Sequence, residues 1–216
     1  MRIRSLAGLS LLILLLCRAC IAQQQVPQAS LVKLSDVFST VRDKLWERND
    51  DYWHHGWFNR CIGNMRMITQ IDPRDTEAYI DAAWLMDSDV REEDAEAFLR
   101  EGLANNPDVS DMYQELGTFL YLRMRFDESI IYLSGAVMTD APPFVWHQLA
   151  HAYERAGRIG DCLDTWFEIE AMEPDNGVAP MQIDRILHGG EPSRAPEGVV
   201  NAIAQRKKDK QAEQQP

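Results

Sequence analysis

Apolar residues recur with helical spacing through the middle of this 216-residue chain. Between residues 146 and 156 they are three or four positions apart, which places them on one face of a helix. Gly157 interrupts this series, and a second series with the same spacing follows before Pro174. The first series is Trp146, Leu149, Ala150 and Tyr153, and the second is Cys162, Trp166 and Ile169. The pattern predicts two helices joined by a short turn.

The same pattern recurs at intervals of 33 or 34 residues toward the N-terminus. Tyr113, Tyr79 and Leu45 take the place that Trp146 has in the last copy. Each copy has a small residue at one fixed point of its second helix, and these residues are Cys61, Ala95, Ser129 and Cys162. A small side chain lets two helices approach closely, so this restriction has a steric cause. Nothing in the repeats alternates with a period of two, so we expect no strands.

The order of residues in each copy resembles the tetratricopeptide repeat, whose pattern is W-x2-L-G-x2-Y, A-x3-F, P. The last copy departs from it where Ala150 replaces Gly, Cys162 replaces Ala and Trp166 replaces Phe. The resemblance implies an all-α fold, a right-handed solenoid of about four helical hairpins with a C-terminal capping helix. The expected units cover residues 42–75, 76–109, 110–142 and 143–176.

The first 22 residues are typical of a signal peptide. Arg2 and Arg4 precede an apolar run over residues 6–16, which is short for a bilayer span, and Ala22 offers a cleavage site. We therefore expect an exported protein, periplasmic or secreted, with no transmembrane domain after cleavage. Lipidation at Cys20 and retention of the segment as an uncleaved membrane anchor are the alternatives.

The segments on either side of the repeats have their own compositions. Residues 23–34 are Gln-rich and are expected to form a flexible lead-in. The repeat domain is expected to cover residues 35–176, with Ser35 as the N-cap of its first helix. Residues 177–205 should form capping helices. Residues 206–216 are charged and Gln-rich without an apolar face, so we expect a disordered tail.

The chain is acidic, with 22 Lys and Arg against 34 Asp and Glu and a net charge of −12. The signal segment contains three arginines and no acid, so its removal would bring the net charge to −15. This balance disfavours nucleic acid and anionic membranes as partners and favours a neutral or basic protein or peptide. Two of the four cysteines, Cys61 and Cys162, lie outside the signal segment, three units apart. We expect both to be buried core residues beyond disulfide reach.

The resemblance also implies a binding surface, because the first helix of each repeat in this family lines a concave groove. The candidate partner-binding residues on that basis are Trp46, Asp50, Trp53, Trp84, Asp87, Tyr121, His147 and His151. Aromatic side chains interleaved with carboxylates suit an extended ligand that has apolar and cationic side chains. Filling of the groove by the lead-in helix or the tail of the same chain is the alternative. The variant of this family that clamps a C-terminal carboxylate is not expected, because this groove is acidic.

His147 and His151 are four residues apart on one predicted helix face, a spacing that can hold a divalent metal with Glu154 as the nearest third ligand. Gln148 stands where a zinc protease needs its catalytic glutamate. The sequence shows no other catalytic arrangement, so we predict no catalytic residue and no cofactor. We expect a non-catalytic interaction scaffold or assembly factor in the cell envelope. A metal- or small-ligand-binding protein that uses His147 and His151 is the alternative.

Overall fold

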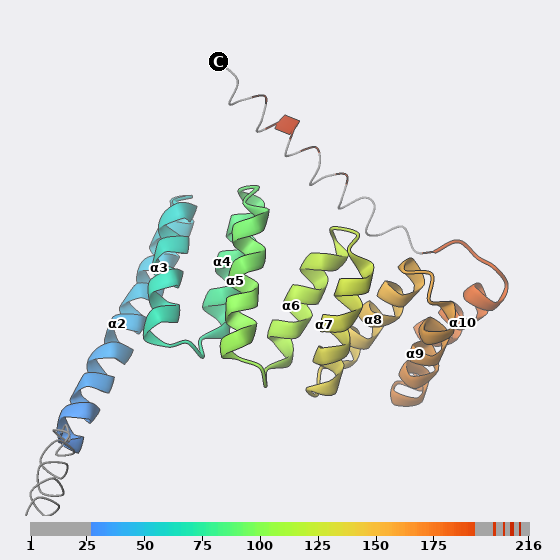
Figure 1. Ribbon diagram of the computed structural model, residues 1–216, viewed down its shortest axis with the longest axis horizontal. Coiled ribbons are helices and arrows are strands. Elements are labelled where there is room, and N and C mark those ends of the chain that lie inside the picture. Colours follow the sequence, from blue (N-terminus) through green and yellow to red (C-terminus); the bar gives the residue numbers. More distant parts are fainter. Residues whose placement is uncertain (1–26, 193–200, 202–204, 206–207, 210–211, 213–216) are drawn as a thin grey trace, which may run out of the picture. The chain divides into compact units, whose positions relative to one another are not determined.

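The computed structural model describes residues 27–192 and, beyond them, Asn201, Gln205, Lys208, Asp209 and Ala212 (Figure 1). Within this part of the chain all regular secondary structure is helical. The helices are α2 (Gln28–His54), α3 (Phe58–Ile71), α4 (Thr76–Ser88), α5 (Glu92–Asn105), α6 (Ser110–Tyr121), α7 (Phe126–Met138), α8 (Pro143–Arg155), α9 (Ile159–Met172) and α10 (Val178–Leu187). The expected all-α architecture is confirmed. The predicted signal segment lies outside the described residues.

The chain divides into two compact units, Met1–Asp43 and Lys44–Pro216. The described part of the first unit is essentially the N-terminal section of α2. Because α2 begins at Gln28, the part of the expected flexible lead-in that the structure describes is helical instead. Pro27 explains this start, since its carbonyl accepts a hydrogen bond of 2.8 Å from the Ser30 N–H and proline is well suited to the beginning of a helix.

In the Lys44–Pro216 unit, helices that are adjacent in sequence pack as hairpins, α4 with α5, α6 with α7 and α8 with α9 (Figure 1). The four small residues predicted at the close contacts, Cys61, Ala95, Ser129 and Cys162, are all completely buried. Ser129 Oγ donates a hydrogen bond of 2.7 Å to the Gly117 carbonyl on the other helix of its hairpin. A Cβ added to Gly117 would lie 2.8 Å from the Leu133 side chain. The helices therefore approach too closely for larger residues at these points.

The turn inside each hairpin repeats one geometry. The residue just past the first helix has a left-handed backbone, with φ of +70° at Gly56, +61° at Val90, +60° at Met124 and +76° at Gly157. In each case the next N–H bonds back to a carbonyl five residues earlier, as from Arg91 to Met86 at 2.8 Å. This is the Schellman arrangement, which usually has glycine at its left-handed position. Val90 and Met124 adopt it without glycine, so two of the turns carry backbone strain.

The loops between hairpins tie neighbouring units together. Asn106 is completely buried, and its Nδ2 donates hydrogen bonds of 2.9 Å to the carbonyls of Pro73 and Gly102. Arg74 and Asp108, in the loops at the ends of successive units, form a two-pronged ion pair with distances of 2.6 and 2.8 Å. These contacts lock one unit to the next at the end of the hairpins opposite the left-handed turns.

The described C-terminal helix covers the end of the hydrophobic core. Ala179 and Ile183 of α10 are buried against Trp166, which is completely buried itself. This is the arrangement expected of a capping helix. Within the described residues, no helix combines the length and apolar character needed to cross a membrane.

The tail also differs from expectation where it is described. Lys208, Asp209 and Ala212 have helical backbone conformation, although the composition predicts a disordered tail. The side chain of Gln205 donates a hydrogen bond of 2.9 Å to Asp209, one helical turn away. Lys, Gln and Ala all have high helix propensity, which explains local helix in a segment without an apolar face.

Candidate partner-binding surface

Two exposed tryptophans lie against each other on α2 and α4, the first helices of successive hairpins, and we call the first helix of each hairpin an inner helix. Trp53, at the end of α2, is 45% exposed, and Trp84, on α4, is 58% exposed. Their ring centroids are 5.8 Å apart with an angle of 27° between the planes, and Phe58 meets Trp53 edge-on at 5.4 Å. Aromatic surface exposed in a cluster is typical of a binding site. The structure thus brings together two of the predicted binding residues.

A cleft of about 340 Å³ opens beside this stack, and we call it the α2–α4 cleft. It is lined by Trp46, Asn49, Asp50, Trp53, Cys61, Met65 and Asp81. Trp46 is half-buried, and its Nε1–H donates a hydrogen bond of 3.1 Å to Asp75, the N-cap of α4. Asp50 is exposed and lies 3.6 Å from the ring of His54. Trp46 is therefore held in place as a wall of the cleft, while Asp50 stays open to solvent.

Asn49 is the polar residue most deeply buried in the α2–α4 cleft. It is only 4% exposed, yet neither atom of its side-chain amide has a hydrogen-bond partner. The equivalent position in the later units is Ala83, Gly117 or Ala150. The backbone carbonyl of Asn49 receives a contact of 3.7 Å from the Cys61 thiol, the counterpart of the bond from Ser129 to Gly117. The backbone of the first unit therefore follows the repeat geometry, and only the side-chain amide of Asn49 departs from it.

Two half-buried carboxyl groups on the inner helices have no cationic partner among the described residues. Asp81 lies on α4 and Glu115 on α6. Burial raises the pKa of Asp81, and the nearby charges of Glu77 and Asp75 raise it further. Burial likewise raises the pKa of Glu115, with a contribution from Asp111. The fold therefore places negative charge on this surface without compensating for it.

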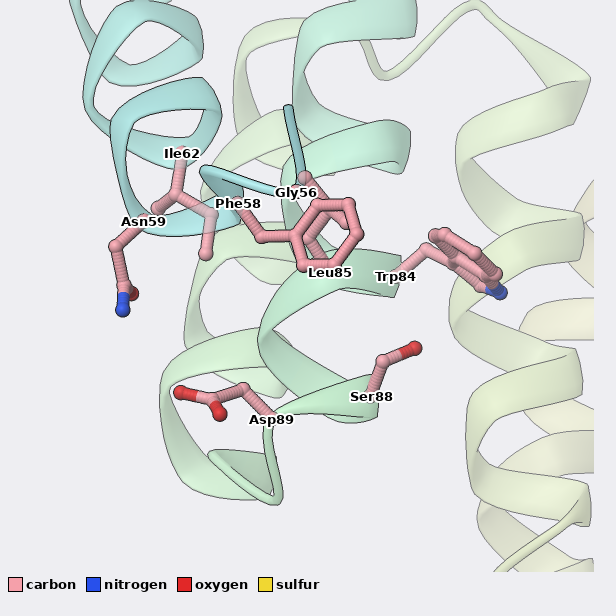
Figure 2. A pocket seen from close by; sticks show the side chains of 8 residues that line it. All are labelled: Gly56, Phe58, Asn59, Ile62, Trp84, Leu85, Ser88 and Asp89. Carbon is pink, nitrogen blue, oxygen red and sulfur yellow. The ribbon is translucent and has the colours of Figure 1, made fainter. Parts of the chain in front are cut away.

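A second cleft lies between the start of α3 and the end of α4 (Figure 2). Figure 2 shows Phe58 and Ile62 from α3 together with Leu85 and Ser88 from α4 around it. Trp84 lines this cleft and also a smaller one of about 160 Å³ whose walls include Glu115 and residues at the end of α6. Trp84 is thus shared by two clefts and is the most exposed tryptophan of the described chain.

Asp87 already has a partner within the chain. It forms an ion pair with Arg123, whose guanidinium also lies 3.7 Å from Glu92. The Arg123 guanidinium carbon sits 3.4 Å from the centroid of the Phe119 ring, and the side chain is only 11% exposed. Asp87 lines the smaller cleft, but its charge is neutralised there by Arg123.

Tyr121 contributes little open surface. It is half-buried, and its ring meets Phe126 edge-on at 5.5 Å. Burial raises the pKa of its hydroxyl to about 12, so the group stays neutral at physiological pH.

The two histidines on α8 are engaged by neighbouring residues. His147 Nε2 lies 3.1 Å from Glu173, and both histidine rings meet Trp166 edge-on, at 5.2 and 5.3 Å. Burial lowers the pKa of His151, an effect that nearby Glu154 opposes. His151 Nδ1 lies 3.8 Å from Glu154 Oε2, too far for a hydrogen bond. Both histidines are thus part of the packing around Trp166.

Glu154, the third member of the predicted metal set, is paired with a cation. Its side chain is 3% exposed, and its Oε1 accepts a hydrogen bond of 2.7 Å from Arg185 on α10. Within the described part of the chain, no three His, Cys, Asp or Glu side chains are grouped as metal ligands would be. The geometry gives no support to the metal-binding alternative.

The candidate residues chosen from the sequence do not include Asn49, Asp81 or Glu115, and they do not reveal the partner of Asp87. Asn49 occupies a position that is Ala or Gly in the other units, so an alignment of the repeats could have identified it as an exception. The pairing of Asp87 with Arg123 spans 36 residues and depends on the direction of two long side chains. The repeat pattern carries no information about such pairs, because they lie outside its recurring positions.

Comparison with known protein families and with curated proteins gives no match. Comparison with solved structures gives many. A MamA protein structure has a TM-score of 0.58 at 14% identity, covering 82% of this chain and 97% of its own. PilF of Pseudomonas aeruginosa has a TM-score of 0.54 at 15% identity, covering 81% of this chain and 87% of its own.

A third structure is described as a thermophilic TPR protein, TTC0263 of Thermus thermophilus. It has a TM-score of 0.50 at 18% identity and covers 68% of this chain and 81% of its own. At these identities the comparisons establish the fold. The chain has the tetratricopeptide-repeat fold, as its sequence pattern predicts.

Proposed function

We propose that this protein is a non-catalytic interaction module that holds an extended segment of a partner protein against the inner surface of α2, α4 and α6. The observation that carries the proposal is the stacked pair of Trp53 and Trp84, both about half exposed and bordered by clefts on either side. Exposed aromatic residues in such a setting are the usual anchors of protein interfaces.

The partner is neutral or basic in this proposal. Asp81 and Glu115 border the tryptophan pair without cationic partners in the described chain, and the whole chain carries a net charge of −12. A basic segment would be attracted by these two carboxylates and by the net negative charge, whereas an acidic segment would be repelled. We further propose, from the sequence of residues 1–22, that the protein is exported and acts as a scaffold or assembly factor in the cell envelope. Sequencing of the N-terminus of the protein from its native host tests that part separately.

Site-specific crosslinking tests the binding surface. A photoreactive phenylalanine analogue is placed at Trp84, and in a second protein at Phe167 of α9, which is 49% exposed and lies outside the proposed surface. Both proteins are irradiated in the native host, and crosslinked partners are identified by mass spectrometry. The captured partner is then purified, and its affinity is measured for the wild type and for Trp53→Ala/Trp84→Ala.

The proposal predicts a discrete partner from position 84 that is absent from position 167. It also predicts an affinity loss of about a hundredfold in the double variant, because anchor residues typically contribute more than 1 kcal/mol each. The same partners from both positions, or wild-type affinity in the double variant, would contradict the proposed surface.

A further inference from the structure

The α2–α4 cleft contains a polar group that the fold leaves without a partner. The Asn49 side-chain amide is buried, and both its donor and acceptor atoms lack hydrogen bonds. Leaving such a group unmet is unfavourable, and alanine fills the same position in two later units. A bound group that donates a hydrogen bond to Asn49 Oδ1 would account for a buried amide in place of alanine.

The charge in the cleft defines what that group must be. Asp81 reaches the cleft from α4 with no cationic partner among the described residues, and Asp75 and Glu77 add negative potential nearby. Asp50 stands on the α2 side, where its neighbour His54 is positive only when protonated. The cleft therefore has two carboxylates and an amide oxygen as acceptors.

The remaining walls of the cleft are flat and apolar. Trp46 and Trp53 contribute indole rings, and Met65 adds a thioether side chain. A guanidinium group stacks on such rings and has five N–H donors in a planar fork, so it can satisfy several acceptors at once. An ammonium group has only three donors and is more strongly hydrated, so it fits this combination less well.

We propose that the α2–α4 cleft binds the guanidinium group of an arginine side chain, held between Trp46 and Trp53 by Asp50, Asp81 and Asn49. The inference rests on the proposed function, since it names the side chain through which the partner enters the surface. It gives that surface a specificity that exposed tryptophans alone would not have.

Titration with a small arginine compound tests the cleft without any partner protein. The probe is N-acetyl-arginine methylamide, and the readout is the set of indole N–H signals of the ¹⁵N-labelled protein in NMR spectra. The cleft predicts saturable shifts of the Trp53 and Trp46 signals. The isosteric neutral compound N-acetyl-citrulline methylamide should bind at least about tenfold more weakly, because it lacks the charge. N-acetyl-lysine methylamide should also bind more weakly.

Variants assign the binding to the named residues. Asp81→Asn and Asn49→Ala should each weaken binding of the arginine compound by about tenfold or more. Glu168→Gln, which neutralises an exposed carboxyl group on α9 outside the proposed surface, is the matched control and should bind as the wild type does. Neither cleft variant removes a side-chain hydrogen bond or ion pair seen among the described residues, so their melting temperatures should equal or exceed that of the wild type. A purely structural Asn49 would instead give a lower melting temperature in Asn49→Ala.

Equal affinity for the citrulline or the lysine compound, or wild-type affinity in Asp81→Asn, would overturn the assignment. The outcome is separable from that of the crosslinking experiment. Arginine binding without any captured partner would leave the cleft intact and refute the proposed function. A partner captured at position 84 without arginine binding would support the proposed function and refute the arginine site.

Discussion

The two ends of the repeat array treat their polar side chains differently. Around α2 and α4, a buried amide, a half-buried carboxyl group and two exposed tryptophans have few partners within the chain. Around α8 and α10, the buried Glu154 is paired with Arg185, and His147 is paired with Glu173. The buried charge at the C-terminal end is therefore paired, although His151 Nδ1 and Trp166 Nε1 are unbonded there, whereas at the N-terminal end a half-buried carboxyl group has no cationic partner among the described residues. The binding surface that we propose therefore rests on which side chains lack partners among the described residues as well as on their positions in the repeat.

The tryptophans of the two ends offer the largest contrast. Trp166 is completely buried, so Trp166→Ala should lower the free energy of unfolding by about 4 kcal/mol through the cavity it leaves. Trp53 is half exposed, so Trp53→Ala should cost about 1 kcal/mol or less. Urea unfolding followed by circular dichroism measures both. Similar losses for the two variants would show that Trp53 is a core residue.

The Glu154–Arg185 pair tests whether the C-terminal end depends on its internal pairing. Arg185→Ala leaves a buried carboxylate without its cation, which should cost about 3 kcal/mol in urea unfolding. Arg158→Ala removes a solvent-exposed pair with Asp161 and should cost less than about 0.5 kcal/mol. Addition of Glu154→Gln to Arg185→Ala should recover part of the loss, because the unpaired charge is then gone. If Arg185→Ala proves as mild as Arg158→Ala, the contrast between the two ends does not hold.

Asn49 predicts a change of the opposite sign at the N-terminal end. Asn49→Ala removes an unmet buried amide and should raise the free energy of unfolding by about 1 kcal/mol in the absence of ligand. Asn106, equally buried but bonded to two carbonyls, is the control, and Asn106→Ala should be destabilising. Destabilisation by both variants would mean that the Asn49 amide has a structural role.

Asp81 predicts a pH dependence. Its pKa is raised in the folded protein, so its contribution to stability is present at low pH and lost as the pH rises through the folded-state pKa. Asp81→Asn should therefore raise the melting temperature at pH 7 and have little effect below about pH 4, where the carboxyl group is protonated in both states. Glu96 is the control, because hydrogen bonds from Arg125 and Arg100 lower its pKa despite opposing burial. Glu96→Gln should lower the melting temperature at pH 7.

His151 gives the smallest expected effect, at the other end of the array. Burial lowers its pKa in the folded protein, so its contribution to stability is present above about pH 6.5 and is lost as the pH falls through the folded-state pKa. The His151→Gln variant should therefore lose less stability than the wild type between pH 7 and pH 5, as measured by thermal unfolding. An unchanged pH profile would show that His151 is exposed to solvent.

The repeat pattern is sufficient to predict the fold because its residues act locally. Cys61, Ala95, Ser129 and Cys162 are predicted at close contacts from their size alone, and all four are completely buried. The early start of α2 is not predicted, because the glutamine-rich composition of the lead-in obscures the helix-initiating Pro27.

The site can be predicted only in part. Trp53 and Trp84 are exposed, as their position on the first helix of a repeat predicts. Asp87, His147 and His151 lie on the first helices of their hairpins, as the repeat pattern predicts. Their partners lie elsewhere in the chain: Arg123 pairs with Asp87, Glu173 with His147, and Trp166 packs against His151. Those pairings depend on the directions of side chains in three dimensions, which spacing along the chain does not encode.

The small residue at each close helix contact has a consequence for the length of the molecule. Because the contact is made by equivalent residues in successive hairpins, residues 76–109 form a nearly interchangeable module. If this module were duplicated, each hairpin would still pack against the same kind of neighbour. The chain would gain a second copy of α4, with its Trp84 and Asp81. Duplication of the first unit would differ, since each copy would bring another buried and unbonded Asn49 amide. The array is therefore modular in its middle and unique where it begins.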